Sequence, residues 1–338
     1  MADESAPQAH LNLHKSPMTD ETFMRRCIAL AQNGRYHAAP NPMVGCCIVS
    51  GGRIIGEGFH ARCGEPHAEV NAIRSVRSAD RERLKESTLY VSLEPCAHFG
   101  RTPPCAQLIL QSGIPRVVVG CTDPFSKVSG RGIAMLREGG VEVVTGVLEE
   151  ECRRLNRQFM TAQTLHRPFI TLKWAVSADG FLDRWRTEPD EAPAHLSNPR
   201  SQMRVHKLRA SHGAILVGHA TLRLDCPSLT VRAWCGENPQ PVVLGRVEEG
   251  ELPQGFQAFD DIDVMLSTLH AGGCRSLLVE GGSQTLQSFI DQGLWDAAHV
   301  EVSDCVLGSG VPAPRMPAGV CMKVEQALGA HFLHYENL

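Results

Sequence analysis

Two segments decide the fold of this chain: Pro66-His67-Ala68-Glu69 and Glu94-Pro95-Cys96-Ala97-His98-Phe99-Gly100-Arg101-Thr102-Pro103-Pro104-Cys105. One imidazole and two thiolates form a ligand set typical of catalytic zinc, which keeps a fourth position open for water. We expect His67, Cys96 and Cys105 to be these ligands. A carboxylate beside the metal must carry protons from water to the departing amine, and Glu69 has the His-x-Glu spacing of zinc nucleobase deaminases. The pattern predicts hydrolytic deamination with Glu69 as the catalytic group.

The surroundings of these ligands agree with the assignment. Residues 88–93 are typical of a buried strand, which would present Cys96 at its carboxyl end. Pro104 precedes Cys105 and an apolar run, so Cys105 is expected to open a helix, whose positive end favours thiolate. We interpret His98 as a loop or substrate contact, because a fourth protein ligand would leave no place for water.

Chance is the simplest alternative, because the chain has 13 Cys and 15 His. The joint pattern is far rarer than any pair within it, and the other cysteines are interpreted as small core or surface residues. A second alternative treats the zinc as structural and the chain as a binding or scaffold protein whose fold the metal stabilises. The count of three ligands, with Glu69 beside them, argues against such a closed site.

The spacing of the two cysteines distinguishes among deaminases. Nucleic-acid and nucleoside editors usually carry Pro-Cys-x-x-Cys, whereas eight residues separate Cys96 from Cys105 here. Four further segments accompany this spacing: Pro40-Asn41-Pro42-Met43-Val44-Gly45, Gly56-Glu57-Gly58-Phe59-His60, Gly64-Glu65-Pro66-His67-Ala68-Glu69-Val70 and Asp123-Pro124-Phe125-Ser126-Lys127-Val128-Ser129-Gly130-Arg131-Gly132. With them, the first half of the chain closely resembles the bacterial bifunctional riboflavin-biosynthesis family, in which a zinc-dependent pyrimidine deaminase is joined to a reductase.

The resemblance implies further contacts in the deaminase site. Asn41 and His60 would orient the pyrimidine ring, and Lys127 would meet the substrate phosphate. The residues alone leave other interpretations open. Asn41 lies between two prolines and could be a simple turn residue, His60 could be a surface histidine at a strand end, and Lys127 could be a solvated lysine.

Length and composition limit the class of protein. A chain of 338 residues suits two domains of roughly 150 residues each. The hydrophobic fraction is 43% and no apolar run approaches the roughly 20 residues of a membrane span, so we expect a soluble protein without membrane contact. The net charge of −4 and the lack of a basic block argue against nucleic acid and favour a small substrate. Residues 1–17 are polar, lack a signal peptide's apolar stretch and are expected to be a disordered tail, which indicates a cytoplasmic protein with free thiols.

The first half alternates helices and strands. An amphipathic helix is expected over residues 20–32, a hairpin over 44–56 with Ser50-Gly51-Gly52 at its turn, and later strands at 88–93, 116–120 and 141–145. Helices are expected over 104–111 and 131–138. This alternation predicts a three-layer α/β/α sandwich, the fold that the deaminase resemblance also implies. We expect the deaminase domain to span residues 18–148, a charged linker 149–167 and a second domain 168–338.

The second half also predicts an α/β domain. Strands are expected at 168–176, 214–217, 241–244 and 276–279, with helices at 199–210 and 284–291. The last strand runs into Glu280-Gly281-Gly282-Ser283, where backbone N–H groups could approach a phosphate closely. Without Gly-x-Gly-x-x-Gly, a plain tight turn is an equal alternative.

Four segments of this half resemble the family's reductase: Leu172–Gly180, Val205–Ala210, Asp225–Arg232 and Val279–Gly282. The resemblance implies a dihydrofolate-reductase-like fold that uses NADPH. It places Lys173 and Glu280 near the ribose to be reduced. It also implies substrate contacts from Arg209, Leu229 and Arg232, and an NADPH border formed by Ala175, Thr221, Asp225, Gly282 and Ser283. For Arg209 and Arg232, a solvated charge is nearly as good an interpretation.

Several positions depart from the reductase pattern. Glu191–Ser197 replaces a Gly-x-Ser-x-Trp-like segment, Cys226 replaces an Asp, and Gly245 stands where an Asp commonly ends a strand. Around Asp261-Ile262 the chain is shorter than family members by roughly a strand and a loop. An impaired reductase is therefore one expectation.

The sequence as a whole indicates a bifunctional riboflavin-biosynthesis enzyme. Its first site would deaminate 2,5-diamino-6-(5-phosphoribosylamino)pyrimidin-4-one with Zn²⁺, and its second would reduce the ribosyl chain of the product with NADPH. The alternative is a deaminase of a nucleotide or tRNA base with an inactive reductase-like domain. The family's tendency to pair through its reductase half implies a homodimer.

Overall fold

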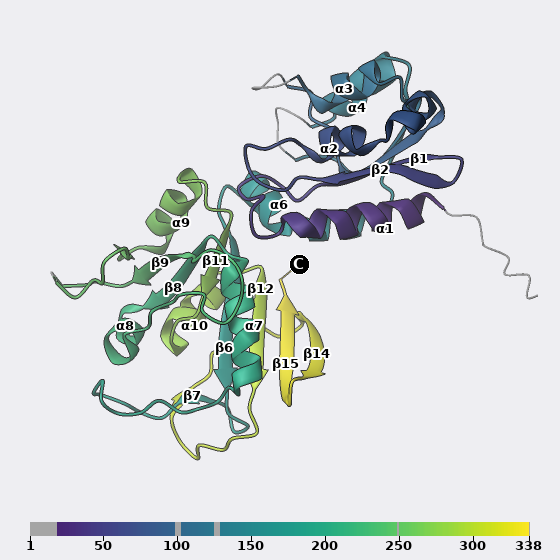
Figure 1. Cartoon of the computed structure of the whole chain (residues 1–338). Helices are drawn as coiled ribbons and strands as arrows, with labels where there is room; N and C mark the ends of the chain where they lie inside the picture. Colours follow the sequence, from purple (N-terminus) through teal and green to yellow (C-terminus); the bar gives the residue numbers. More distant parts are fainter. Residues whose placement is uncertain (1–18, 99–102, 125–128, 249, 338) are drawn as a thin grey trace, which may run out of the picture.

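The computed structural model describes residues 19–98, 103–124, 129–248 and 250–337. They form two α/β domains that lie side by side (Figure 1). The predicted tail of residues 1–17 lies outside the described residues. In the described part of the chain, every helix is too short or too polar to cross a bilayer.

The first domain is a three-layer sandwich, as predicted. Its sheet has the order β2-β1-β3-β4-β5, with β1 antiparallel to both neighbours and β3, β4 and β5 parallel. The strands are β1 (Gly45–Ser50), β2 (Arg53–Phe59), β3 (Thr88–Leu93), β4 (Arg116–Cys121) and β5 (Glu142–Thr145). The predicted hairpin is confirmed, and Gly51 and Gly52 adopt φ of 57° and 73° in its turn, a conformation that favours glycine.

Helices cover both faces of this sheet. One apolar core joins it to α2 (Ala68–Ser75), α3 (Cys105–Gln111) and α4 (Arg131–Glu138). The other core joins it to α1 (Asp20–Ala31), which begins at Thr19, whose hydroxyl accepts from the Thr22 N–H. The short 3₁₀ helices η1 (Gln32–Gly34) and η2 (Ser78–Glu86) complete the domain.

Residues 149–167 differ from the expected linker, because most of them form two helices. These are α5 (Glu149–Leu155) and α6 (Arg157–Thr164). Cys152 of α5 and Met160 of α6 are buried in the core beneath α1, and Phe159 packs against the same core, so both helices dock on the first domain. Between the helices, the Asn156 side chain accepts from the Met43 N–H and donates to the Met43 carbonyl at 2.8 and 2.9 Å. Few apolar residues mark these helices in the sequence, which is why they were missed; the exact domain limits stay a prediction.

The second domain contains an eight-stranded sheet of order β10-β9-β8-β11-β6-β12-β15-β14. Its strands are β6 (Phe169–Val176), β8 (Ala214–Gly218), β9 (Gln240–Leu244), β10 (Gln257–Phe259), β11 (Ser276–Val279), β12 (Ala297–Val302), β14 (Cys321–Ala327) and β15 (Ala330–Glu336). Neighbours from β10 to β12 are parallel, and β15 and β14 add an antiparallel edge. The short strands β7 (Phe181–Asp183) and β13 (Val311–Pro312) pair separately.

Helices again cover both faces. One core holds α9 (Ile262–Ala271) and α10 (Ser283–Asp291), and the opposite core holds α8 (His219–Asp225) with part of α7 (Pro199–Ala210). The strands expected from 168, 214, 241 and 276 and the helices expected at 199–210 and 284–291 are present. The sequence interpretation missed α8, α9, β7, β10 and everything from β12 onward.

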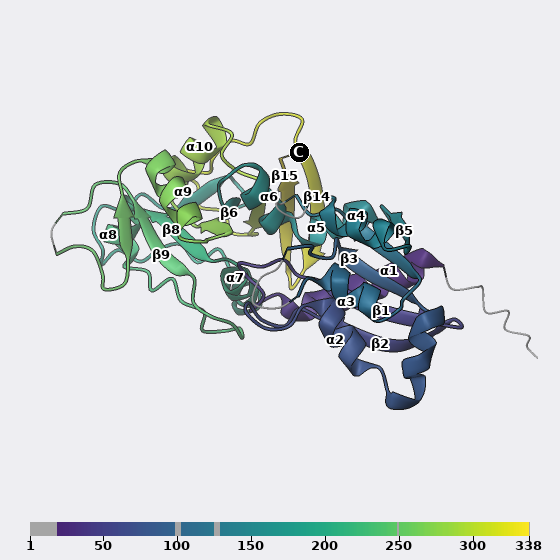
Figure 2. The ribbon, with the colours of Figure 1, turned by 90° about the horizontal axis from the view of Figure 1, so that it is seen from above.

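Direct contacts join the two domains. Figure 2 shows α5 and α6 at their junction. The Trp234 Nε1–H donates to the Tyr36 hydroxyl at 2.9 Å, and the Gln158 amide donates to the Ser211 carbonyl at 3.2 Å. Arg154 forms an ion pair with Glu336 at the end of β15. Polar contacts therefore fix how the first domain faces the second.

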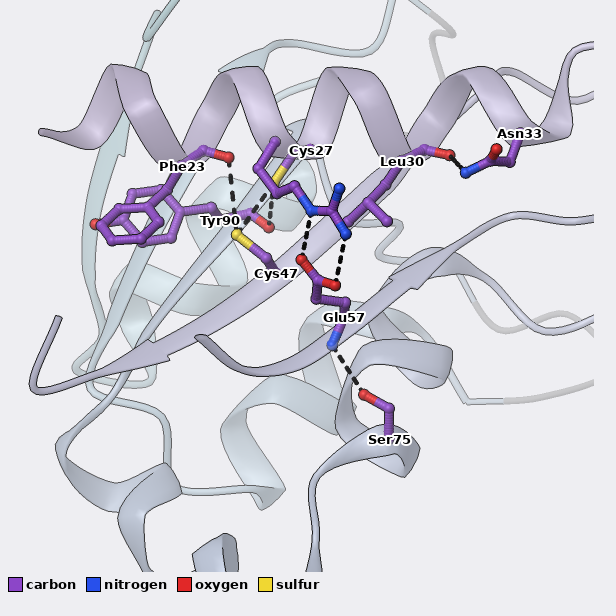
Figure 3. A network of polar contacts seen from close by, with 9 residues as sticks. Phe23, Cys27, Leu30, Asn33, Cys47, Glu57, Ser75 and Tyr90 are labelled. Carbon is purple, nitrogen blue, oxygen red and sulfur yellow. Dashed lines mark hydrogen bonds and ion pairs between the residues drawn. The ribbon is translucent and has the colours of Figure 1, made fainter. Parts of the chain in front are cut away.

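Polar contacts and close backbone packing hold α1 on the first sheet, and Figure 3 shows the polar contacts. The Cys27 thiol donates to the Tyr90 carbonyl at 3.3 Å, and Arg26 binds Glu57 of β2 through two hydrogen bonds of 2.6 and 2.8 Å. Gly45 makes this approach possible, because a Cβ there would lie 2.0 Å from the Cys27 carbonyl oxygen and 2.8 Å from the Ala31 nitrogen.

Replacing Gly45 with alanine should therefore push α1 away from β1. We expect Gly45→Ala to lower the free energy of unfolding by about 2 kcal/mol or more, measured by urea denaturation followed by circular dichroism. Gly272→Ala is the matched control, because its φ is −71° and a Cβ there has no neighbour closer than 3.4 Å. It should shift stability by less than about 1 kcal/mol, and equal effects of both changes would contradict the packing argument.

Candidate active sites

Three separate segments bring metal-binding side chains to one point at the end of β3. His67 caps the amino terminus of α2, Cys96 follows β3, and Cys105 is the first residue of α3. Their ligand atoms all lie within 4.8 Å of one another. The His67 Nδ1 atom is 3.6 Å from the Cys96 sulfur and 3.3 Å from the Cys105 sulfur.

These distances fit a shared zinc ion. Zinc bonds of about 2.3 Å to sulfur and about 2.05 Å to nitrogen, at a tetrahedral angle, place the two ligand atoms about 3.6 Å apart. Among the described residues, no fourth histidine, cysteine or carboxylate joins the group. One imidazole and two thiolates with an open position are the donor set of a catalytic rather than a closed structural site.

The protein stabilises the thiolate of Cys96. Hydrogen bonds from the Cys105 side chain and then from His67 lower the pKa of the Cys96 thiol to about 4. The backbone N–H of Cys105 also donates to the Cys96 sulfur at 3.3 Å. Because Pro104 sets the start of α3, this N–H is free to point at the sulfur instead of bonding within the helix.

Glu69 lies beside the ligands in the first turn of α2, with only 3% of its surface exposed. Burial raises the pKa of its carboxyl group to about 7, although the positive charge of His67 acts in the opposite direction. A carboxyl group with a pKa near neutrality can both accept and release a proton under physiological conditions.

A cavity of about 440 Å³ opens in front of these residues, and Asn41 and His60 line it together with His67 and Glu69. The His60 Nδ1–H can donate to the Pro66 carbonyl at 3.2 Å, which leaves Nε2 to accept from the Asn41 amide at 3.1 Å. Burial lowers the pKa of His60, which favours this neutral form. His98 also lines the cavity, whereas Lys127 lies outside the described residues.

Glu94 organises this site, although the sequence interpretation gave it no role. Its buried carboxylate accepts from the backbone N–H groups of Asp123, Gly130, Gly132 and Ile133 at 3.0 to 3.3 Å. It thereby ties the end of β3 to the start of α4. Its position immediately before Pro95-Cys96 was the only available sequence signal.

Other lining residues of this cavity come from unexpected segments. Phe159 and Gln163 belong to α6, and Arg275 precedes β11 in the second domain. No pattern near the zinc ligands could have indicated them, because they reach the cavity only through domain packing.

A second cavity, of about 260 Å³, lies in the second domain and is lined by Lys173, Ala175 and Glu280, among others. The structure thus brings together three of the residues expected near ribose and NADPH. Two hydrogen bonds of 3.1 and 2.7 Å join the Arg209 guanidinium to the Glu280 carboxylate, and a third joins it to the Thr230 carbonyl at 3.1 Å. Burial would raise the pKa of Glu280, but Arg209 and Lys173 outweigh it, so that pKa is lowered.

The remaining reductase candidates lie in different surroundings. The Leu229 side chain is buried in the core, with φ of 53°. Arg232 donates from its guanidinium to the Thr230 hydroxyl and from its backbone N–H to His206. Asp225 is paired with Arg186 and does not line the second cavity.

The Gly281-Gly282 turn leads into α10, as expected. Gly282 caps the helix before Ser283, and a Cβ on Gly282 would meet the Thr221 hydroxyl at 3.3 Å, so these three candidates are neighbours. A Cβ on Gly281 would lie 2.8 Å from the Thr285 side chain. Close packing is therefore enough to explain why residue 281 is a glycine. The binding of a phosphate by the backbone N–H groups of this turn stays a prediction.

The segment that departs from the reductase pattern lines the second cavity. His195, Leu196 and Ser197 contribute to its wall. The Ser197 hydroxyl donates to Glu301 of β12 at 2.6 Å, and Glu301 is buried. A different set of side chains thus occupies the place of the Gly-x-Ser-x-Trp-like segment.

Comparisons with known proteins match both halves. Residues 17–121 match the cytidine and deoxycytidylate deaminase zinc-binding region, and residues 168–327 match the RibD C-terminal domain. The chain is 36% identical to the riboflavin biosynthesis protein RibD of Aquifex aeolicus, over 94% of this chain and 96% of that protein. It is 35% identical to RibD of Bacillus amyloliquefaciens, over 89% and 88% of the two chains.

Solved structures agree with the sequence comparisons. A diaminohydroxyphosphoribosylaminopyrimidine deaminase/5-amino-6-(5-phosphoribosylamino)uracil reductase from Thermotoga maritima superposes with a TM-score of 0.85 at 34% identity, covering 94% of this chain and 99% of that one. RibD of Acinetobacter baumannii gives a TM-score of 0.82 at 30% identity, covering 94% and 98%. The expected fold of both domains is therefore confirmed.

Metal analysis tests the three-ligand site. We expect purified protein to hold about one zinc per chain, whereas Cys96→Ser and Cys105→Ser should each lose most of it, because a hydroxyl is a poor replacement for a thiolate. Cys321→Ser is the matched control, since Cys321 is exposed on β14 in the other domain. Retention of zinc by both ligand variants would contradict the assignment.

Proposed function

The chain belongs to the RibD family of bifunctional riboflavin-biosynthesis enzymes, and from that premise we propose a substrate for each of its two sites. The first domain hydrolyses the 2-amino group of 2,5-diamino-6-(5-phosphoribosylamino)pyrimidin-4-one. The second domain then reduces the ribosyl chain of the deaminated product to a ribityl chain, with NADPH as the hydride donor.

One observation carries the deaminase assignment. The three ligand atoms of His67, Cys96 and Cys105 leave a coordination position open, and the buried carboxyl of Glu69 lines the same cavity. A structural zinc closed by four protein ligands would have no position for water and would need neither a cavity for substrate nor a group to move protons. The arrangement suits hydrolysis of a flat, nitrogen-rich ring that fits into the cavity.

Each residue of the deaminase site has a separate proposed role. His67, Cys96 and Cys105 would hold zinc, which would supply a Lewis acid that makes water acidic enough to act as a nucleophile near pH 7. Glu69 accepts a proton from that water and delivers it to the departing amine, which leaves as ammonia. His60 accepts from the Asn41 amide and so fixes its rotamer, which leaves the Asn41 Oδ1 atom to accept a hydrogen bond from the pyrimidine. Lys127 is proposed to meet the phosphate.

In the second site the hydride chemistry belongs to NADPH, and the protein must align the two reactants. Lys173 and Glu280 are proposed to flank the ribose, because both line the second cavity. Arg209 uses three of its five N–H groups on Glu280 and Thr230. Two remain for the substrate, and Leu229 and Arg232 are proposed to complete that contact.

NADPH is proposed to lie along a separate border of this site. The residues assigned to it are Ala175, Thr221, Asp225, Gly282 and Ser283. Support comes from Thr221 of α8, which lies beside Gly282 at the start of α10, and from Ala175 in the second cavity. Asp225 would have to exchange its partner Arg186 to take part.

A homodimer in the cytoplasm is the proposed state of the enzyme. β14 is an edge strand with both faces exposed, including Met322 and Val324 at 48% and 62%. Long exposed edges of this kind are usually covered in a native assembly. The thirteen free cysteines suit a reducing compartment.

Measurement of ammonia release tests the deaminase. Zinc-loaded protein should release ammonia from the diamino substrate without NADPH. Glu69→Gln should slow this release by about 100-fold or more while zinc content stays unchanged, because the amide cannot carry protons. No ammonia from the wild type would refute the proposed substrate, and a nucleotide or tRNA deaminase would then be the alternative to assay.

The reductase is tested separately in the same protein. NADPH oxidation should depend on the deaminated product and should fall by about 10-fold or more in Glu280→Gln, because this change removes the charge that holds Arg209 in place. Ammonia release should be unaffected, which controls for folding. If wild-type protein releases ammonia but never oxidises NADPH, the second domain lacks reductase activity, and the altered segment around His195 is the expected cause.

A further inference from the structure

A residue of the second domain forms part of the wall of the deaminase cavity. Arg275 immediately precedes β11 in the second sheet, yet it lines the same cavity as Asn41 and Glu69. From the geometry we infer that Arg275 binds the substrate phosphate in the deaminase site, so that this site is built from both domains. The inference rests on the proposed substrate.

The Arg275 guanidinium has no partner among the residues that the structure describes. Its Nε atom is buried and makes no hydrogen bond, and neither terminal nitrogen donates to a described group. Three other arginines of this domain each form an ion pair: Arg167 with Asp296, Arg186 with Asp183 and Asp225, and Arg209 with Glu280. Arg275 as a whole is only partly buried, but leaving its buried Nε atom without a hydrogen-bond partner is costly, so an anion is expected to complete the guanidinium.

Three described acidic residues line the cavity, Glu69, Glu94 and Asp123, and none of them forms an ion pair with Arg275. Glu94 is engaged by four backbone N–H groups, and Glu69 lies beside the metal ligands. His270 is close enough for Arg275 to lower its pKa, although burial is the larger cause of that shift. A neutral histidine cannot neutralise the guanidinium. The missing negative charge is therefore expected from a ligand.

The cavity has room for such a ligand beyond the zinc ligands. At Pro40 and Arg275 it meets a larger cleft of about 700 Å³ between the domains. Arg35 and Arg62 also line this cleft, which among the described lining residues contains one carboxylate, Glu237. Phosphate placed at the junction would thus lie in surroundings of positive charge.

The proposed substrate has a matching shape. Its reacting amino group is at one end of the pyrimidine, and its phosphate is carried on the ribose attached at another position of the ring. With the ring at the metal, the phosphate must point out of the cavity. A planar guanidinium can bind two phosphate oxygens at once, which a solvated lysine cannot do.

Two substrates separate this role from a structural one. The phosphoribosyl substrate and its dephosphorylated ribosylamino analogue are deaminated by wild type, Arg275→Gln and Arg275→Lys, without NADPH. For Arg275→Gln we expect KM of the phosphorylated substrate to rise about 10- to 100-fold. Its kcat should change little, and kcat/KM for the analogue should equal that of wild type. Arg275→Lys should recover part of the loss.

Arg81→Gln is the matched control, because Arg81 is exposed on η2 in the first domain and lines neither cavity. It removes the same charge and should leave both KM values unchanged. Reduction of the deaminated product by Arg275→Gln should proceed at the wild-type rate, which shows that the second domain remains folded.

Two results would overturn the inference while leaving the proposed function intact. One is an unchanged KM for the phosphorylated substrate in Arg275→Gln, and the other is an equal loss with both substrates. If wild type releases no ammonia, the proposed substrate fails, and calorimetric titration with ribose 5-phosphate decides the remaining question. Weaker binding by Arg275→Gln than by wild type would support an anion site at Arg275, and equal binding would refute it.

Discussion

The first site depends on one geometric constraint: three side chains from separate segments must meet within the span of a single zinc ion. Two helix starts and one strand end satisfy it. His67 and Cys105 stand at the starts of α2 and α3, where backbone N–H groups have no helical partner, and Cys96 follows β3. The Glu94 carboxylate holds the neighbouring turns by accepting four N–H groups. The order of strands in the first sheet matters for function because it brings these ends together.

The same constraint explains the electrostatics of the site. Burial raises the pKa of the Glu69 carboxyl, and the charge of His67 offsets this only in part. Glu280 in the second site is equally enclosed but has Arg209 and Lys173 beside it, and its pKa is lowered. Burial acts to raise the pKa of both acids, and the hydrogen-bonded Arg209 together with Lys173 reverses the shift at Glu280.

The junction between the domains is also part of the chemistry. Segment 149–167 packs as α5 and α6 on the first domain, and α6 supplies Phe159 and Gln163 to the deaminase cavity. Trp234 and Tyr36 fix the facing surfaces, so Arg275 is held at the same cavity. Joining the two domains in one chain thus shapes the first site and does more than keep two enzymes together.

The sequence by itself determined the three-layer fold of the first half and the α/β nature of the second, and it predicted the zinc ligands and Glu69. Those features follow from local spacing: ligand types at fixed intervals, alternating apolar periods, and glycine or proline at turns. It did not reveal α5 and α6, which dock through few apolar side chains such as Cys152, Phe159 and Met160, nor β15 and the edge strand β14. Only the tertiary structure decided that Glu94 gathers distant N–H groups and that Arg275 reaches the other domain's cavity. Such contacts join residues far apart in the chain, and no local pattern records them.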